Sequence, residues 1–529
     1  MSFAESISHQ ATYEPKGITP SGLSIRSHKL ISNAGSASIL PNQVFEFSIP
    51  TGNDALLDTN SMSLEFGVAV FETANADKTI RFDGSAFSVL QSYTLLHNSV
   101  PLETCSELPL LANILFDLGM SFGDRNTIQG CRFGMMNSLD YAYSLTFASG
   151  TAVMPEGTST TLSTGDKASS NIGNRAPDMV QVRWGASLWS NKVAAVTPTE
   201  AEYNAGVSRG HFSLPVLSGF IGSLAHRATP LYAMNGDLRV RFQTNLLERG
   251  LQATSTTDAT NITSGYGWKL LDVRLVYKTI HLGGLANQMR LAYPMPTIAS
   301  QYYGHQSASV VATDSQVQKT LAFRYSSLND ILFCMTPTAN SGTTYNPEYT
   351  RRIRNNLTQF SIVVDGKYYP SSKMDTTKQG EILGYLAESQ HAKNKAFWAN
   401  SLICRAQRVN IAEMSITSAN ATGFGVETDG GNPFMGLVGD SGTTTSTNDS
   451  PFGYLMNCTF PENNLIGITL QSFQHADNAL LSGVDTLDKQ VTGELQFNGG
   501  ATEAATAHWF SCFDVIYSVD SVGQTSVRY

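Results

Sequence analysis

A strict alternation of apolar and polar residues is the feature that most constrains how this chain can fold. In "SMSLEFGVAVF", residues 61–71, one face of a two-residue repeat collects the apolar side chains of Met62, Leu64, Phe66, Val68 and Val70. The same repeat returns in "DLRVRFQT", residues 237–244, with Arg239 and Arg241 on the polar face. An α-helix repeats every 3.6 residues, so both segments predict half-buried β-strands.

Other segments extend this prediction along the chain. Strand-forming residues dominate the ranges 44–49, 87–103, 268–280, 317–335 and 356–370, and an apolar run over 214–221 predicts a further strand. Within 356–370, Asp365-Gly366 marks a tight hairpin turn. Charged residues make up only 15% of the chain, which is low for helices filled with Glu and Lys. The predicted fold class is therefore all-β.

The order of the segments repeats once along the chain. "FSVLQ" at 87–91 and "FSIVV" at 360–364 each precede a segment with helical signals, at 106–119 and 374–393. A long loop rich in Thr, Ser and Gly follows in each half, at 149–178 and 439–451, and the halves close on "WKLLDVRLVY" at 268–277 and "WFSCFDVIY" at 509–517. Many short strands with long loops in a duplicated order predict two similar antiparallel sandwiches in tandem.

Composition also suggests where the chain divides. Residues 1–40 are polar and rich in turn formers, which predicts an N-terminal arm. Residues 283–316 contain Gly-Gly, two prolines and many small polar residues, which predicts a linker. The two sandwiches then occupy residues 41–282 and 317–529.

Charge and cysteine content exclude several classes of protein. A net charge of -9 and a pI near 5.6 disfavour a protein whose main function is to bind nucleic acid, because such binding needs clustered Lys and Arg. The six cysteines are scattered and predict reduced thiols. Neither a signal-peptide core at the start nor a run of 18 apolar residues occurs, so we expect a chain kept in a cytosol-like compartment that does not span a membrane.

Motifs with catalytic or ligand-binding potential are weak. "GDSG" at 439–442 resembles the serine segment of trypsin-like proteases, but the nearest histidine candidate, His508 in "TAHW", lies downstream rather than upstream. Ser441 is therefore expected in an exposed turn. The ten histidines show no zinc-ligand spacing, and no phosphate-binding loop occurs. We predict no catalytic, cofactor-binding or metal-binding residue.

Two further features of the sequence concern the protein surface. In "YTRRIRNNL", Arg351, Arg352 and Arg354 form the densest positive run, and we expect a solvated loop or a subunit contact there. Five Asn-X-Ser/Thr sequences occur by chance in a chain so rich in Asn and Thr, and none is expected to carry a glycan: Asn261, Asn356, Asn420, Asn448 and Asn457.

An ordered set of these segments resembles the double jelly-roll major capsid proteins of DNA viruses, particularly those of polinton-like viruses, virophages and their large-virus relatives. The set comprises "ALLDTNSMSLEFGV", the strand-then-helix piece over 87–119, "LPVLSGFIGSLAHRATPLYAMNGDLRVRFQT", "WKLLDVRLVYKTI" and "FRYSSLNDILF". Together these landmarks span residues 55–335.

The resemblance implies two tandem eight-stranded jelly-roll sandwiches with short helices and long surface loops. It further implies a structural subunit without catalytic activity or cofactors, three copies of which make a pseudo-hexagonal capsomer of an icosahedral virion around double-stranded DNA. The partners would be copies of itself, neighbouring capsomers, penton and minor capsid proteins, with an internal membrane as an option. Assembly would take place inside the host cell, in cytoplasm or nucleus.

Two other classes of function stay open at this point. A viral spike or carbohydrate-binding β-sandwich attachment protein would use exposed aromatic residues as a sugar platform. A β-sandwich hydrolase would need two carboxylates that converge in a cleft.

Overall fold

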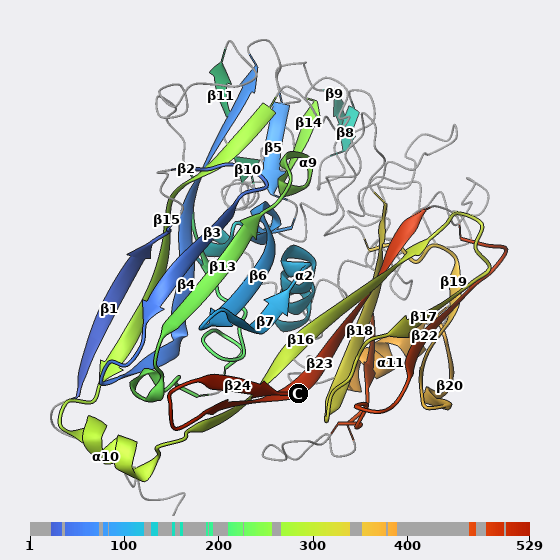
Figure 1. Ribbon diagram of the computed structural model, residues 1–529. Helices are drawn as coiled ribbons and strands as arrows, with labels where there is room; N and C mark the ends of the chain where they lie inside the picture. The colour runs from blue at the N-terminus through green and yellow to red at the C-terminus, as the bar shows by residue number, and fades with distance from the viewer. Residues whose placement is uncertain are drawn as a thin grey trace, which may run out of the picture.

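The structure is a computed structural model that describes residues 23–33, 38–73, 78–82, 84–120, 128–135, 151–153, 159–161, 187–188, 190–193, 210–225, 227–255, 266–338, 352–376, 379–388, 465–471, 483–501 and 504–529. β-strands dominate the described residues, and most of them belong to two neighbouring bodies (Figure 1).

The first body is built from eight strands in two facing sheets. In chain order these are β1 (Ser24–Ile31), β3 (Val44–Pro50), β4 (Ala55–Thr73), β6 (Leu90–His97), β7 (Val100–Cys105), β12 (Gly210–Pro215), β13 (Asp237–Thr244) and β15 (Tyr266–His281). One sheet has the order β1-β15-β4-β12 and the other β3-β13-β6-β7, with antiparallel neighbours throughout. This is the strand order of an eight-stranded jelly roll.

The second body repeats this order strand for strand. Its strands are β16 (Thr297–Val310), β17 (Gln316–Leu321), β18 (Leu328–Pro337), β19 (Leu357–Val364), β20 (Lys367–Asp375), β21 (Ile466–Thr469), β22 (Val491–Phe497) and β23 (Ala505–Val519). They pair antiparallel as β16-β23-β18-β21 and β17-β22-β19-β20. In both bodies the first strand therefore pairs with the eighth and the second with the seventh, which makes the chain a double jelly roll.

Shorter elements extend the two rolls. Helix α2 (Leu108–Gly119) follows the fifth strand of the first roll, and α11 (Gln379–Glu388) follows the fifth strand of the second. Helix α10 (Leu285–Ala292) connects the rolls, and β24 (Thr525–Arg528) pairs with β23. The others are β2 (Ser38–Ile39), β5 (Lys78–Phe82), η1 (Ala86–Val89), α4 (Ile128–Phe133), β8 (Thr151–Val153), β9 (Ser159–Thr161), β10 (Ser187–Leu188), β11 (Ser190–Val193), η2 (Leu231–Ala233), α9 (Leu247–Gly250) and β14 (Leu251–Ser255).

The predicted alternation builds the core of the first roll. The five apolar side chains named on β4 are buried, and so are Leu238, Val240 and Phe242 of β13, because these faces lie between the two sheets. A second core of similar kind fills the second roll around Phe333, Phe360 and Trp509.

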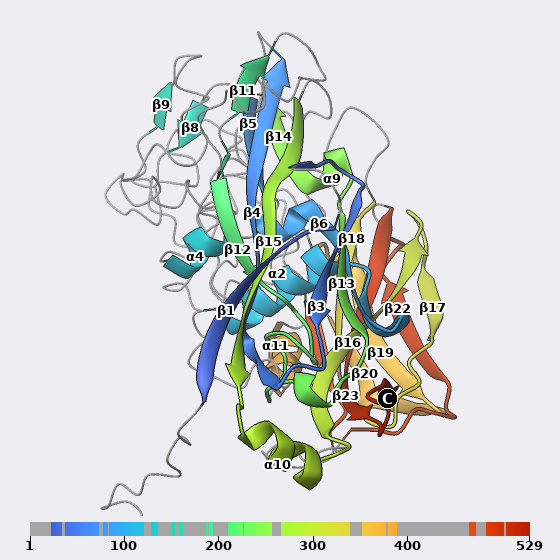
Figure 2. The ribbon, with the colours of Figure 1, turned by 60° about the vertical axis from the view of Figure 1, so that its left-hand side comes forward.

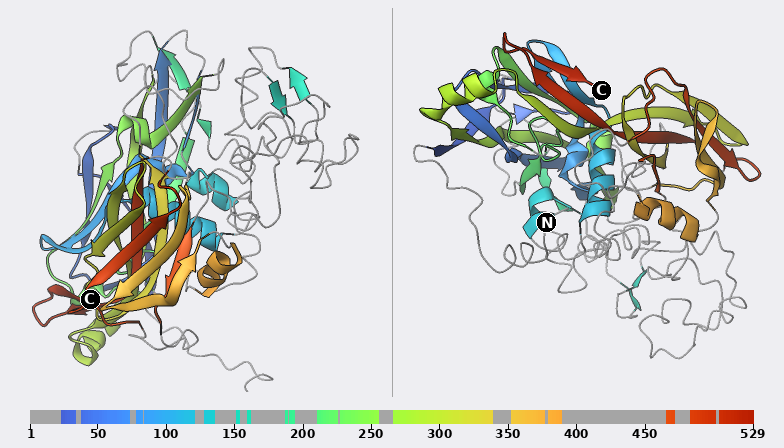
Figure 3. Two further views of the ribbon diagram at one scale, coloured as in Figure 1. Left: turned by 90° about the vertical axis from the view of Figure 1, so that its right-hand side faces the viewer. Right: turned by 90° about the horizontal axis from the view of Figure 1, so that it is seen from below.

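The rolls lie side by side, and the chain passes from one to the other at one end through α10 (Figure 2). Seen from below, α2 and α11 lie on the same side of the pair (Figure 3). The two predicted loops, 149–178 and 439–451, both fall between the fifth and sixth strands of their roll. Of the first, the structure describes only the hairpin β8–β9, and the second lies outside the described residues.

Two predicted segments differ from the structure. The range 1–40, expected as an arm, contains β1, which pairs with β15 from Ser24↔His281 to Ile31↔Arg274. The range 283–316, expected as a linker, contains α10 and the whole of the first strand of the second roll, β16. Both strands lie at sheet edges, and several of their polar side chains are exposed to solvent. They therefore contain fewer apolar residues than the strands that were predicted from their apolar pattern.

The apolar run 214–221 was wrongly predicted as a strand. Strand β12 ends at Pro215, and the chain then turns tightly, with the Ser223 N–H donating to the Val216 carbonyl at 2.8 Å. Phe220 and Ile221 are buried nonetheless, because the second roll covers this turn.

The proposed match of "FSVLQ" with "FSIVV" is also wrong in detail. Phe87 lies in η1, and the strand begins only at Leu90, whereas Phe360 lies inside β19. The closing segments, in contrast, are true counterparts, because 268–277 lies in β15 and 509–517 in β23.

Candidate assembly surfaces

The second roll packs its long strands β16 and β23 against the first roll. We call this contact the seam; on the second roll its side chains are Tyr302, Phe510, Phe513, Val515 and Tyr517. The first roll meets them with β7 and the turn at 216–225, and the rings of Phe220 and Tyr517 lie 4.7 Å apart. As a result β23 is buried on both faces, with Trp509 in the core of the second roll and residues from Phe510 onward in the seam.

Close backbone approach and hydrogen bonds fix the seam. A Cβ atom on Gly219 would lie 2.7 Å from the carbonyl oxygen of Gln301, so the turn needs glycine there. Polar contacts cross it at several points: Asn235 N to the Gly523 carbonyl at 2.9 Å, Thr525 N to His97 Nδ1 at 3.1 Å, and Tyr529 Oη to the Leu102 carbonyl at 3.1 Å. The two rolls therefore form one packed unit.

A buried carboxyl group lies in the seam. Glu103 of β7 is 2% exposed, and its Oε1 accepts hydrogen bonds from the backbone N–H of Phe220 at 2.9 Å and from the Tyr517 hydroxyl. Its Oε2 lies 3.3 Å from Tyr93 Oη. Burial raises the pKa of Glu103 to about 7, while the hydrogen bonds from Ser218, Tyr517 and the backbone act in the opposite direction.

Two histidines form a second polar feature of the seam. His305 Nδ1 lies 3.0 Å from Ser106 Oγ, and His305 Nε2 lies 3.0 Å from Nδ1 of His508. The remaining nitrogen of His508 lies 3.0 Å from Thr336 Oγ1. Burial lowers the pKa of His305 to about 4 and that of His508 to about 3. Both rings are therefore neutral at pH 7, which is the form that this hydrogen-bonded chain requires.

The equivalent strands of the first roll have an open outer surface. It consists of the outward side chains of β1 and of residues 274–280 of β15, including Ile25 at 71% and Ile31 at 76% exposure; we call it the open face. Ile25 pairs with Ile280, and Ile31 with Arg274, so apolar and basic side chains alternate across it. Large apolar side chains this exposed on a flat sheet edge are typical of surfaces that another chain covers.

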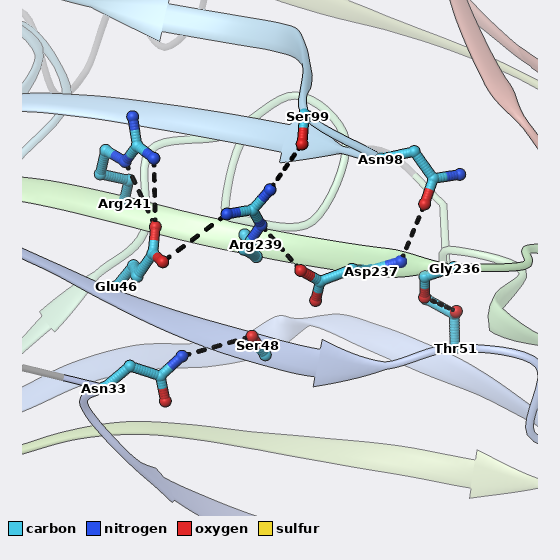
Figure 4. A network of polar contacts seen from close by, with 10 residues as sticks. All are labelled: Asn33, Glu46, Ser48, Thr51, Asn98, Ser99, Gly236, Asp237, Arg239 and Arg241. Atoms are coloured by element: carbon cyan, nitrogen blue, oxygen red, sulfur yellow. Dashed lines mark hydrogen bonds and ion pairs between the residues drawn. The ribbon is translucent and has the colours of Figure 1, made fainter.

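The outer face of the other sheet of the first roll has a different character (Figure 4). Arg239 Nε is 2.7 Å from an Asp237 oxygen, and its Nη2 donates to Ser99 Oγ at 2.8 Å. Arg241 Nη2 is 3.3 Å from Oε2 of Glu46. These charged groups form ion pairs and hydrogen bonds within the sheet, so this face is polar where the open face carries large exposed apolar side chains.

The motifs weighed from the sequence do not converge on one site. Ser441 and Arg351 lie outside the described residues, and His508 is buried in the seam. Arg352 was expected in a solvated loop or a subunit contact but is fully buried in the second roll, which corrects that prediction. Arg354 is half-buried, as is Asn356; the other four Asn-X-Ser/Thr sites lie outside the described residues.

Three buried cysteines, Cys105, Cys334 and Cys512, take part in no disulfide. Within the described ranges, no group of three or more His, Cys, Asp or Glu side chains is placed to hold a metal ion. No described helix is long and apolar enough to cross a membrane. Sequence reasoning missed Glu103 and the seam, since nothing in a strand pattern distinguishes burial in a core from burial between two bodies.

Comparison with known proteins gives structural similarity only. The sequence matches no protein-family model and no curated protein. The structure is similar to the Faustovirus major capsid protein, at 10% identity and a TM-score of 0.47 over 98% of this chain and 94% of that one. It is similar to the mavirus major capsid protein at 10% identity and a TM-score of 0.45, over 98% of this chain and 93% of that one. It is also similar to a chain of the PBCV-1 virus capsid at 9% identity and a TM-score of 0.48, over 98% of this chain and 99% of that one.

Proposed function

We propose that this chain is a major capsid protein, a structural subunit that assembles as a trimer with a pseudo-hexagonal outline. The observation that carries the proposal is the unequal burial of two equivalent pairs of strands. In the second roll, β16 and β23 are covered by the first roll, while the equivalent strands β1 and β15 of the first roll keep the open face, with Ile25 and Ile31 in solvent.

Repeating the seam contact between chains closes a ring. The first roll contacts the second roll through its fifth strand, β7. The fifth strand of the second roll, β20, is the equivalent strand and carries exposed residues such as Tyr368 at 41%. If the open face of one copy covers the β20 side of the next, each chain gives one contact and receives one. Three chains would then place six similar rolls around an axis, and a head-to-tail contact that closes in this way limits itself to a ring.

The proposal includes a shell around double-stranded DNA in which trimers meet one another, pentons and minor capsid proteins. It assigns no catalytic role and no cofactor. The long insertions after the fifth strand of each roll would form the outer surface of the capsomer. The chain would reside in the virion capsid after assembly in the cytoplasm or nucleus of the host.

The test is the oligomeric state of variants on the open face. Ile31→Asp places a charge on the proposed contact, and Val311→Asp places the same charge on a residue that is also strongly exposed but lies in a turn of the second roll. We expect native mass measurements to give trimers for the wild type and Val311→Asp, and monomers with an unchanged melting temperature for Ile31→Asp.

Trimers that persist equally in Ile31→Asp and in the double variant with Ile25→Asp would contradict the assignment of this face. Monomers or isolated fibres of the wild-type chain would instead favour the alternative, a spike or carbohydrate-binding protein.

A further inference from the structure

Glu103 brings a carboxyl group into the seam without a compensating cation. The titratable side chains that face it, one from each packed element, are Tyr93 of β6, Cys105 of β7, Tyr302 of β16, Tyr517 of β23 and Tyr529 after β24. None of these is positively charged at any pH, and the turn at 216–225 adds only a hydroxyl and backbone N–H groups. A carboxylate buried in such surroundings costs far more free energy than the neutral acid.

We propose that Glu103 makes the seam between the two jelly rolls proton-sensitive, with the neutral acid holding the seam closed and the carboxylate loosening it. The geometry accommodates both forms. Oε1 accepts from Phe220 N and Tyr517 Oη in either form, and in the acid the proton on Oε2 is donated to Tyr93 Oη, which can accept as well as donate. Because Tyr517 belongs to the second roll and the other partners to the first, the proton acts on the contact between rolls.

The direction of the effect follows from linkage. The folded chain binds the proton up to about pH 7, whereas the unfolded chain releases it near pH 4.5. The stabilisation is therefore complete below pH 4.5 and is lost as the pH rises through about 7. Between pH 5 and pH 8 this one group should lower the ratio of folded to unfolded chain on the order of tenfold to a hundredfold. The inference concerns a contact within one chain and does not depend on the proposed function.

The experiment compares the full-length wild type with Glu103→Gln at pH 5 and pH 8. The amide imitates the neutral acid and does not titrate. The fall in the ratio of folded to unfolded chain between pH 5 and pH 8 should therefore be on the order of tenfold to a hundredfold smaller in Glu103→Gln than in the wild type. Hydrogen exchange at the Phe220 N–H, corrected for its intrinsic pH dependence, should quicken at pH 8 in the wild type only. Glu65→Gln, a half-buried glutamate on β4 away from the seam, should keep the wild-type pH dependence.

A tyrosine variant separates proton binding from packing. Tyr517→Phe keeps the ring but removes a donor that favours the carboxylate, so the titration midpoint should move upward; Tyr277→Phe, the control on β15, should leave it in place. Should Glu103→Gln fail to fold, infrared spectra of the wild type still report the carboxylic acid band. The proposal is overturned by a wild-type pH slope in Glu103→Gln, or by a carboxylate at Glu103 in the wild type at pH 5.

Discussion

At the scale of single residues, each jelly roll packs a buried tryptophan of its last strand against a glycine. A Cβ on Gly250 would lie 2.5 Å from the ring of Trp268, and one on Gly493 would lie 2.8 Å from Nε1 of Trp509. Gly493→Ala should therefore overpack the second core and cost about 1 to 3 kcal/mol of unfolding free energy. Chemical denaturation measures this free energy. As a control, Gly384→Ala in α11 should be neutral or stabilising, because Gly384 has no described neighbouring residue within 4 Å of the added methyl group. An equal loss of unfolding free energy in both variants would contradict the packing account.

The histidine pair makes a pH prediction of the opposite sign to that of Glu103. Because the folded pKa values of His305 and His508 lie below the usual 6.5, the unfolded chain takes up these protons first as the solution is acidified. Their contribution is complete above pH 6.5 and is lost toward pH 4. Between pH 6.5 and pH 4, the double variant with Gln at both positions should lose about 1 to 3 kcal/mol less unfolding free energy than the wild type. Thermal unfolding at several pH values tests this, and His211→Gln, an exposed histidine of β12, should behave as the wild type.

At the scale of elements, the hairpin between β19 and β20 depends on a two-residue turn that the sequence predicted. Asp365 and Gly366 both have positive φ, at 49° and 78°, as a primed turn between antiparallel strands requires. The space around Gly366 is open, so Gly366→Ala should cost about 1 kcal/mol through backbone strain alone. Asp365→Asn should be tolerated, since Asn also accepts this conformation. Equal stability of Gly366→Ala and wild type in a denaturant titration would refute the assignment.

The elements also show what a sequence can predict. Strands such as β4 and β13 have one buried and one wetter face, so their alternation was visible and the all-β prediction is confirmed. Strand β1 is exposed on most of its residues, so it carries no such pattern and was taken as part of an arm. The part of the run 214–221 that follows β12 is apolar because the second roll covers it, which a local pattern cannot distinguish from a core strand. Contacts between distant segments, such as Glu103 with Tyr517, leave no trace in local sequence.

At the scale of the whole molecule, two rolls of equal strand order joined by one seam explain why β16 and β23 are covered in one roll while the equivalent β1 and β15 keep an open face in the other. Because both rolls have the same strand order, β20 of a neighbouring copy can cover the open face in the way that β7 of the first roll covers the second roll. The most direct test is electron microscopy of the purified full-length chain. We expect particles of three copies with a six-cornered outline and the open face of each copy against β20 of the next. Single copies, or trimers in which Ile25 and Ile31 remain in solvent, would contradict the account.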